Sequence, residues 1–219
     1  MATRLPLFPL STVLVPGLVL PLHVFEPRYR VLVEALMELP EDAERQFGVV
    51  TIRSGREVGV DGVRALYGMG CTAELREVTP YSDGRYDLVT VGETRFRLLG
   101  LDKEAGTPYD TGFVEFVPEE DGDGDVGALA QRVTERFADY RERLGVEVTE
   151  LPDQPQVISY LVAAAVVLDL PERQGLLEQP TTSDRLRAEI ALLRRESALI
   201  SAFRSLPAVD FARESGSAN

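Results

Sequence analysis

The chain has 219 residues, 44% of them hydrophobic, which is enough for one large domain or two small packed ones around an apolar core. The net charge is −13, and the parts before and after residue 118 are both acidic, so neither supplies the basic field that nucleic acids require. No apolar run is long enough for a membrane-spanning helix, and prolines interrupt the N-terminus where a secretory signal would lie. Together with a single cysteine, these features predict a cytoplasmic protein.

The first elements that the sequence predicts are a short strand and a helix. Residues 18–24 form an apolar run of strand length. Glu26 and Pro27 then suit the first turn of a helix, and Pro40 ends it. The apolar face of this helix is formed by Tyr29, Leu32, Val33 and Leu36.

Short strands continue up to about residue 118, separated by glycine and proline. They are predicted over residues 47–53, 63–67, 71–78, 86–91, 95–101 and 111–117. The sequence Ser82-Asp83-Gly84 between two of these runs predicts a β-hairpin, and Ser54-Gly55 predicts a turn. Six or more short strands with one early helix are typical of a small closed or nearly closed barrel.

From Asp125 onward the pattern changes to the helical period. One face of the first helix in this part carries Leu129, Val133, Phe137, Tyr140 and Leu144. Pro152 and Pro155 mark a new start, and residues 157–168 are apolar almost all round, which is typical of a buried helix.

Two further helices are predicted after this one. The third covers residues 171–178. Thr182-Ser183-Asp184 supplies N-cap chemistry for the last helix. The apolar face of that helix consists of Leu186, Ile190, Leu193 and Ile200.

The sequence therefore predicts an α+β protein in which a β-barrel is followed by a helical bundle. We place the barrel subdomain at residues 1–118 and an acidic, glycine- and aspartate-rich linker at 119–126. The helical bundle then covers 127–207, and 208–219 form a flexible tail.

The scarcest residues exclude most catalytic chemistry. The chain has one histidine, His23, one cysteine, Cys71, and one lysine, Lys103. This set cannot build a typical zinc site, and the surroundings of Lys103 match no phosphate-binding loop. No nucleophile elbow is present, so we predict no catalytic residues, no metal and no cofactor. A hydrolase that uses a pair of carboxylates stays open, although no spacing among the 36 acidic residues singles out a pair.

Two motifs resemble ligand sites without their required context. Residues 68–73, GMGCTA, fit a loose dinucleotide-binding pattern, but the residues that follow alternate as in a strand, so we expect a strand-entry turn or bulge. Residues 121–125 resemble the start of a calcium loop. Val126 and Arg132 stand where such a loop needs glycine and a bidentate acid, so a flexible acidic linker is expected.

The opening of the chain carries a more specific signal. Residues 5–10 (LPLFPL), 15–17 (VPG) and 20–29 (LPLHVFEPRY) closely resemble the start of the N-terminal substrate-recognition domain of Lon proteases. Weaker matches follow in order through nearly the whole chain. They are residues 47–50, 70–73, 83–86, 91–97, 108–109, 176–178 and 184–186.

The resemblance implies a PUA-like pseudo-barrel with a helical bundle after it. In Lon proteases this domain precedes an ATPase and a Ser–Lys protease, and it engages unfolded or tagged substrates. The resemblance ends before those modules, and Lys103 alone cannot supply both active sites, so we expect a stand-alone, non-catalytic protein-binding module. The expected partners are unfolded or flexible protein segments, alone or with a protease, and a homo-oligomer stays open. The alternative is RNA binding by a PUA-like barrel.

Six residues are candidates for contacts with a protein partner. His23, Phe25 and Tyr29 around the first helix would line a groove for apolar segments, although helical spacing favours core positions for Phe25 and Tyr29. Glu26, Arg28 and Arg30 would orient a ligand, although helix-end and surface pairing explains these charged residues more simply.

Arg95 and Arg97 complete the set of candidates, since they alternate with Phe96 on a predicted strand and would meet acidic neighbours or carboxylates of a partner. Edge strands of an incompletely closed barrel would also accept an extended segment by strand addition.

Overall fold

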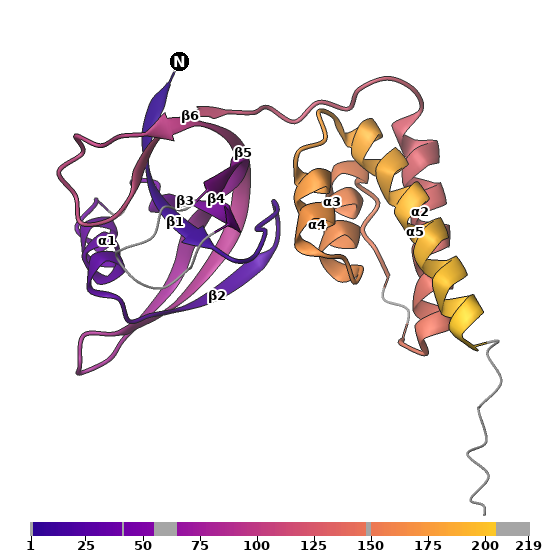
Figure 1. Cartoon of the computed structure of the whole chain (residues 1–219), viewed down its shortest axis with the longest axis horizontal. Coiled ribbons are helices and arrows are strands. Elements are labelled where there is room, and N and C mark those ends of the chain that lie inside the picture. Colours follow the sequence, from indigo (N-terminus) through magenta and orange to yellow (C-terminus); the bar gives the residue numbers. More distant parts are fainter. Residues whose placement is uncertain (1, 41, 55–64, 148–149, 205–219) are drawn as a thin grey trace, which may run out of the picture.

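The computed structural model describes residues 2–40, 42–54, 65–147 and 150–204, and shows a β-barrel beside a helical bundle (Figure 1). The predicted turn at Ser54-Gly55, the start of the strand predicted from residue 63 and the tail at 208–219 lie wholly or partly outside these residues. The barrel consists of β1 (Thr3–Leu10), β2 (Val19–Val24), α1 (Pro27–Met37), β3 (Gln46–Ser54), β4 (Ala65–Pro80), β5 (Tyr86–Leu101) and β6 (Thr111–Phe116). The bundle consists of α2 (Val126–Leu144), α3 (Pro155–Ala165), α4 (Leu170–Leu177) and α5 (Thr182–Arg204). The predicted α+β class is confirmed.

The six strands form one mixed sheet in the order β2-β5-β4-β3-β1-β6, and a second pairing of β5 with β6 curls it into a barrel. β1 is the strand that the sequence did not predict, because Pro6 and Pro9 lack the N–H that a ladder uses. In the fold, β1 pairs with β6 over residues 3–6 and, in parallel, with β3 over residues 7–10. Except at Leu7, whose N–H donates to the Asp110 carbonyl at 2.7 Å, each part of β1 thus has one unpaired edge in the described structure, which is where proline is tolerated.

β4 and β5 are each continuous where the sequence predicted two strands. In β4, residues 68–70 lie inside the strand and form no entry turn, but the pairing with β3 shifts register between Gly70 and Leu66, in line with the bulge that was the other expectation. A Cβ on Gly70 would lie 2.4 Å from the carbonyl oxygen of Val49 and 2.5 Å from the Phe96 ring. Gly70 therefore lets the ring of Phe96 pack against the backbone, and this close contact explains the glycine without a cofactor.

Replacing Gly70 by alanine is expected to destabilise the barrel by roughly 1–3 kcal/mol, because overpacking displaces neighbours that cannot yield. Gly68→Ala is the matched control, since nothing lies within 4 Å of the Cβ that it would add. Urea unfolding of the two variants measures the difference. Equal midpoints would show that the contact of Gly70 with Phe96 is not constraining.

α1 covers the side of the barrel that faces away from the bundle (Figure 1). It begins at Pro27 and buries the four apolar residues that its periodicity predicted. These residues pack in the main barrel core with residues of β1 to β5. This agreement reflects a strong local signal, since proline at the first turn and a helical apolar stripe point to the same element.

In the bundle, α3 and α4 lie next to the barrel, and α2 and α5 lie beyond them (Figure 1). The side chain of Asp125 caps α2 by accepting a hydrogen bond from the Ala128 N–H at 2.9 Å. The hydroxyl of Thr181 accepts from the Asp184 N–H at 3.2 Å, so the cap of α5 lies one residue before the predicted position. No helix in the described ranges is long and apolar enough to cross a membrane.

The segment expected to be a flexible acidic linker is held against α5. The backbone oxygens of Glu120 and Asp121 accept hydrogen bonds from the N–H groups of Thr182 and Ser183, each at 2.9 Å. The hydroxyl of Ser183 also donates to Asp121 O at 2.6 Å. These contacts fix the chain between barrel and bundle, so the linker is ordered where it meets α5.

Candidate functional site

The barrel is open along one seam, between β2 and the second half of β1. In the described part of the chain, β2 pairs with β5 alone, and residues 8–10 of β1 pair with β3 alone, whereas the Leu7 N–H still donates to the Asp110 carbonyl at 2.7 Å. Two strand edges therefore face each other without a ladder between them. Such an opening exposes both backbone groups and the edge of the barrel core.

An apolar pocket of about 180 Å³ lies in this seam. The two strands that border the seam, β1 and β2, and the start of α1 supply its lining. The lining residues are Phe8, Leu10, Pro21, Leu22, His23, Val24, Phe25, Glu26 and Tyr29. Phe8 and Tyr29 stack with ring centroids 4.0 Å apart and planes inclined by 15°. This buried aromatic pair gives the pocket rigid walls, because stacking fixes both rings.

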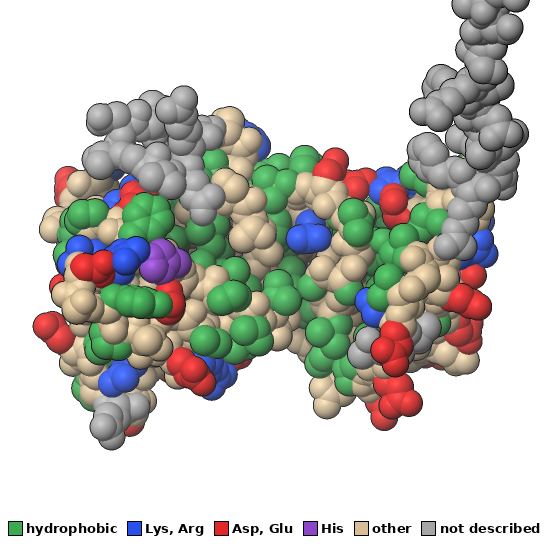
Figure 2. All heavy atoms as spheres, turned by 90° about the horizontal axis from the view of Figure 1, so that it is seen from below, with side chains coloured by type: hydrophobic (Ala, Val, Ile, Leu, Met, Phe, Trp, Pro, Cys, Tyr) green, Lys and Arg blue, Asp and Glu red, His purple; other side chains and the backbone are tan. Residues whose placement is uncertain are grey.

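The outer wall of the pocket is an exposed group around the single histidine, which Figure 2 shows at the surface beside apolar and charged side chains. The His23 and Phe25 rings lie 6.3 Å apart, and His23 meets the edge of Tyr81 at 6.0 Å. Nδ1 of His23 lies 2.6 Å from a carboxyl oxygen of Asp87, whose other oxygen accepts from the Tyr81 hydroxyl at 2.5 Å. These two hydrogen bonds hold the pKa of Asp87 below its ordinary value.

Three of the six candidate residues line the pocket, and one of them, Phe25, is more exposed than its spacing predicted. Tyr29 is 2% exposed and belongs to the core, as its helical spacing indicated. Phe25 is 49% exposed, so the expected core position for it is wrong. The reason is local: Phe25 precedes Glu26, the N-cap of α1, and helical periodicity does not apply before the cap. His23 is exposed and hydrogen-bonded as described above.

Arg28 stands beside the pocket and pairs as the simpler explanation predicted. Its guanidinium lies 2.9 Å from the Glu26 carboxylate and 4.4 Å from the centre of the Tyr29 ring. The ion pair and the cation–π contact hold Glu26 and Tyr29 at the rim of the pocket. In this structure Arg28 therefore positions two residues that line the pocket.

Arg95 and Arg97 lie away from the pocket. Arg97 is exposed and lies 3.8 Å from Glu115. Arg95 is 1% exposed, and its Nε donates to Glu119 at 2.5 Å. Arg95 is too deeply buried to contact a partner at the surface. Both arginines have the acidic neighbour that was one of the two expectations.

The surroundings of Arg95 form the junction between barrel and bundle. The carboxylate of Glu119 accepts from Arg95 and from the Tyr160 hydroxyl, and it also lies 3.3 Å from the guanidinium of Arg185. Arg95 donates further to the carbonyls of Leu177 at 2.9 Å and Gln179 at 2.6 Å. We call Arg95, Glu119, Tyr160 and Arg185 the junction cluster. It joins β5 to α3, α5 and the turn after α4.

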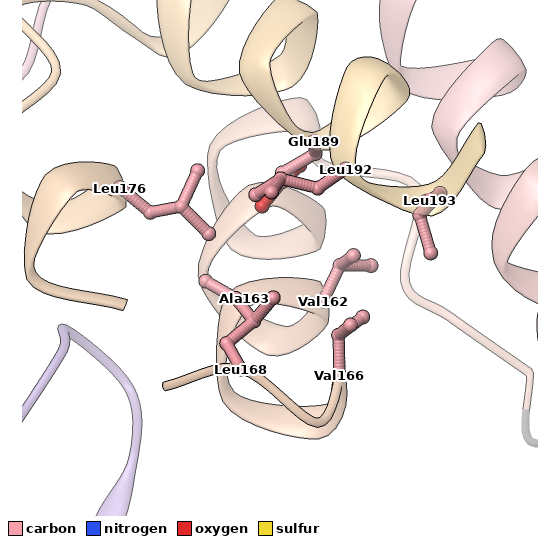
Figure 3. Close-up of a pocket in the computed structure, with 8 residues that line it drawn as sticks. All are labelled: Val162, Ala163, Val166, Leu168, Leu176, Glu189, Leu192 and Leu193. Carbon is pink, nitrogen blue, oxygen red and sulfur yellow. The ribbon is translucent and has the colours of Figure 1, made fainter. Parts of the chain in front are cut away.

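A second group of interest lies inside the bundle, where Glu189 of α5 is 1% exposed. Figure 3 shows its side chain among aliphatic residues of α3, α4 and α5, in a pocket too small for a water molecule. Neither carboxyl oxygen has a hydrogen-bond partner among the described residues. Burial raises the pKa of Glu189 well above its ordinary value, and the positive charge of Arg185 lowers it only in part.

Two further depressions lie elsewhere on the described surface. One of about 430 Å³ lies between α2 and residues 151–158, and one of about 190 Å³ is bordered by Glu44, Glu74 and Glu93. In the acidic depression, Arg76 pairs with Glu74 at 2.7 Å and with Glu93 at 2.8 Å, so its charge is partly balanced. The described residues hold no group of three or more metal-ligating side chains that would bind a metal ion. The seam pocket is therefore the best candidate site.

The sequence did not point to Phe8, Leu10, Pro21 or Leu22 as lining residues. One signal was available, because proline inside a short apolar strand indicates an edge, and an edge strand beside aromatic residues is a place where ligands bind. The contribution of β1 could not be foreseen, since β1 itself was not predicted.

An α+β barrel that opens along one seam, with an apolar pocket in the opening, defines a binding module. The family model of the ATP-dependent protease La (LON) substrate-binding domain matches residues 4–195. The chain therefore belongs to this family, and the resemblance in the opening motif is confirmed.

The relatives are longer proteins. The chain is 28% identical over 205 residues to Lon protease 2 of Myxococcus xanthus and 29% identical over 205 residues to Lon protease of Anaeromyxobacter dehalogenans. Both alignments cover 90% of this chain and 24% of the relative. The chain thus spans about a quarter of the length of the curated relatives that it matches.

Solved structures agree with this assignment. The Lon N-terminal domain protein from Xanthomonas campestris is 29% identical, with a TM-score of 0.62, covering 86% of this chain and 98% of that one. The N-terminal domain of Lon protease from the Mycobacterium avium complex has a TM-score of 0.67 over 90% of this chain and 98% of that one. At 17% identity, this second likeness concerns the fold.

Proposed function

We propose that the chain recognises unfolded or flexible protein segments at the seam pocket and carries no catalytic machinery itself. Membership of a substrate-binding family supports a role in recognition. The observation that carries the proposal is the exposed Phe25 at the mouth of a rigid apolar pocket. Exposed aromatic residues beside a pocket are typical anchors of protein interfaces.

The size of the pocket favours a side chain as its occupant. Pockets for small ligands and cofactors usually measure about 300–1,000 Å³. The seam pocket has about 180 Å³, which suits one large apolar side chain of a longer ligand. Folded proteins bury such side chains, whereas unfolded ones expose them, so the pocket would distinguish the two states.

The proposed connection with proteolysis comes from the relatives, which are Lon proteases. In this proposal, the chain supplies recognition, and a protease that is part of a longer protein or separate from it supplies cleavage. The −13 charge argues against RNA as the ligand, because phosphate would be repelled.

Phe25→Ser is expected to weaken the binding of an unfolded chain about tenfold, because full burial of a phenylalanine contributes roughly 1.5–3 kcal/mol and only the exposed half of Phe25 is buried on binding. The assay is fluorescence anisotropy with labelled, reduced and carboxymethylated α-lactalbumin. Leu99→Ser is the matched control, since Leu99 is 54% exposed on β5 and lines none of the seam pocket. If both substitutions weaken binding equally, the pocket is not the site.

A further inference from the structure

Along β2, the N–H and C=O groups of successive residues point alternately toward β5 and toward the seam. The Gly92 N–H donates to the Leu18 carbonyl at 2.9 Å, and the antiparallel register continues with Leu20 opposite Thr90 and Leu22 opposite Leu88. In an antiparallel pair, every second residue turns both its N–H and its C=O toward the neighbour. Even-numbered residues of β2 therefore face β5, and Val19, Pro21 and His23 direct their backbone groups into the seam.

The residue types along β2 agree with this alternation of even-numbered residues toward β5 and odd-numbered residues toward the seam. Pro21 has no N–H, so it fits only at a position that does not donate to β5. The side chains of Val19, Pro21 and His23 are exposed, whereas Leu20 and Leu22 pack against the barrel core. Among the described residues, no strand pairs with this edge of β2, so it offers carbonyl oxygens at residues 19, 21 and 23, and N–H groups at 19 and 23.

β1 borders the seam on the side opposite β2 and contributes apolar side chains to it. Phe8 and Leu10 of β1 line the same pocket as the residues of β2, while β1 pairs with β3 on its other side. A ligand between β1 and β2 would meet backbone groups along β2 and apolar side chains below them. Only another polypeptide backbone offers donors and acceptors at the two-residue repeat of such an edge.

We propose that an extended segment of the bound chain adds to β2 as a further strand and places one apolar side chain in the seam pocket. This mode of binding rests on the proposed function and specifies how the ligand is held. Six residues of β2 span roughly 20 Å, so about six residues of the ligand would pair. Hydrogen bonds to the backbone tolerate many sequences, and the small pocket selects for one apolar side chain among them.

The first experiment changes the ligand and leaves the protein intact. The probe is a fluorescein-labelled ten-residue peptide of alternating leucine and threonine with a lysine at each end, and it is compared with versions that carry one N-methyl group at successive positions. We expect losses of about tenfold that repeat every second residue, because alternate N–H groups face β2. Losses at every position would mean that the segment pairs with β1 as well, which also supports strand addition.

The second experiment changes the edge of β2. His23→Pro removes an N–H that faces the seam, at a position equivalent to that of Pro21, and His23→Thr keeps this N–H while also removing the imidazole and its bond to Asp87. We expect His23→Pro to bind the peptide at least fivefold more weakly than His23→Thr. Equal melting temperatures would show that both variants keep the fold.

The outcomes separate this inference from the function on which it rests. If the unmodified peptide binds, Phe25→Ser weakens it, and N-methylation has no effect at any position, recognition stands and strand addition is overturned. If neither the peptide nor unfolded α-lactalbumin binds, the proposed function fails and the inference fails with it.

Discussion

Glu119→Gln is expected to destabilise the protein by roughly 3–5 kcal/mol, because it leaves two buried guanidinium groups without their carboxylate. The side chains of Arg95 and Arg185 are fully buried, and Glu119 is the acidic residue that pairs with both. For a chain of this length, such a loss corresponds to a fall of roughly 6–20 °C in melting temperature.

The control for this substitution is Glu115→Gln on the neighbouring strand. Glu115 pairs with Arg97 at 3.8 Å, but both side chains are at least half exposed, and surface ion pairs of this kind contribute about 0–1 kcal/mol. Thermal unfolding and urea titration of both variants give the comparison. If the two substitutions differ by less than about 1 kcal/mol, the junction cluster does not hold barrel and bundle together.

Glu189→Met is expected to stabilise the bundle, and increasingly so as the pH rises. The folded-state pKa of Glu189 lies above that of the unfolded chain, so the folded protein retains a proton that the unfolded chain has lost. The contribution of Glu189 to stability is therefore fully present below the ordinary glutamate pKa and is lost as the pH rises toward the folded-state pKa. Across that window the slope approaches 1.4 kcal/mol per pH unit.

Methionine has a similar length and no charge, so the variant lacks this dependence. Urea unfolding at pH 5, 6.5 and 8 measures the difference from the native sequence, with the exposed Glu142→Met on α2 as the control. We expect the gain for Glu189→Met to grow with pH, and that for Glu142→Met to stay within about 0.5 kcal/mol. A pH-independent difference for Glu189→Met would show that the carboxyl finds a charged partner in solution.

The elements that the sequence predicted well carry strong local signals. α1 combines proline at its first turn with a helical apolar stripe, and α4 begins at Asp169 with a capping box that closes on Glu172. β1 was missed because Pro6 and Pro9 argue against a strand, and their tolerance depends on partners about 40 and 105 residues away. Local patterns do not report such pairings.

The sequence predicted some residues of the candidate site and missed others. The opening motif brought His23, Phe25 and Tyr29 into consideration, and the fold places all three at one pocket. The junction cluster was not predicted, because Glu119 lay in a segment assigned to a flexible linker. Its partners Tyr160 and Arg185 lie 41 and 66 residues further along the chain, and only the docking of bundle on barrel brings them together.

We expect the protein to distinguish unfolded chains from folded ones. The most direct measurement is an anisotropy titration of the native sequence with labelled α-lactalbumin in two forms, reduced and carboxymethylated or native, with a single-stranded RNA as a third probe. We expect saturable binding to the unfolded form that changes little with salt, because the pocket is apolar, and much weaker binding to the other two probes. Equal affinity for native and unfolded forms, or a steeply salt-dependent preference for RNA, would contradict it.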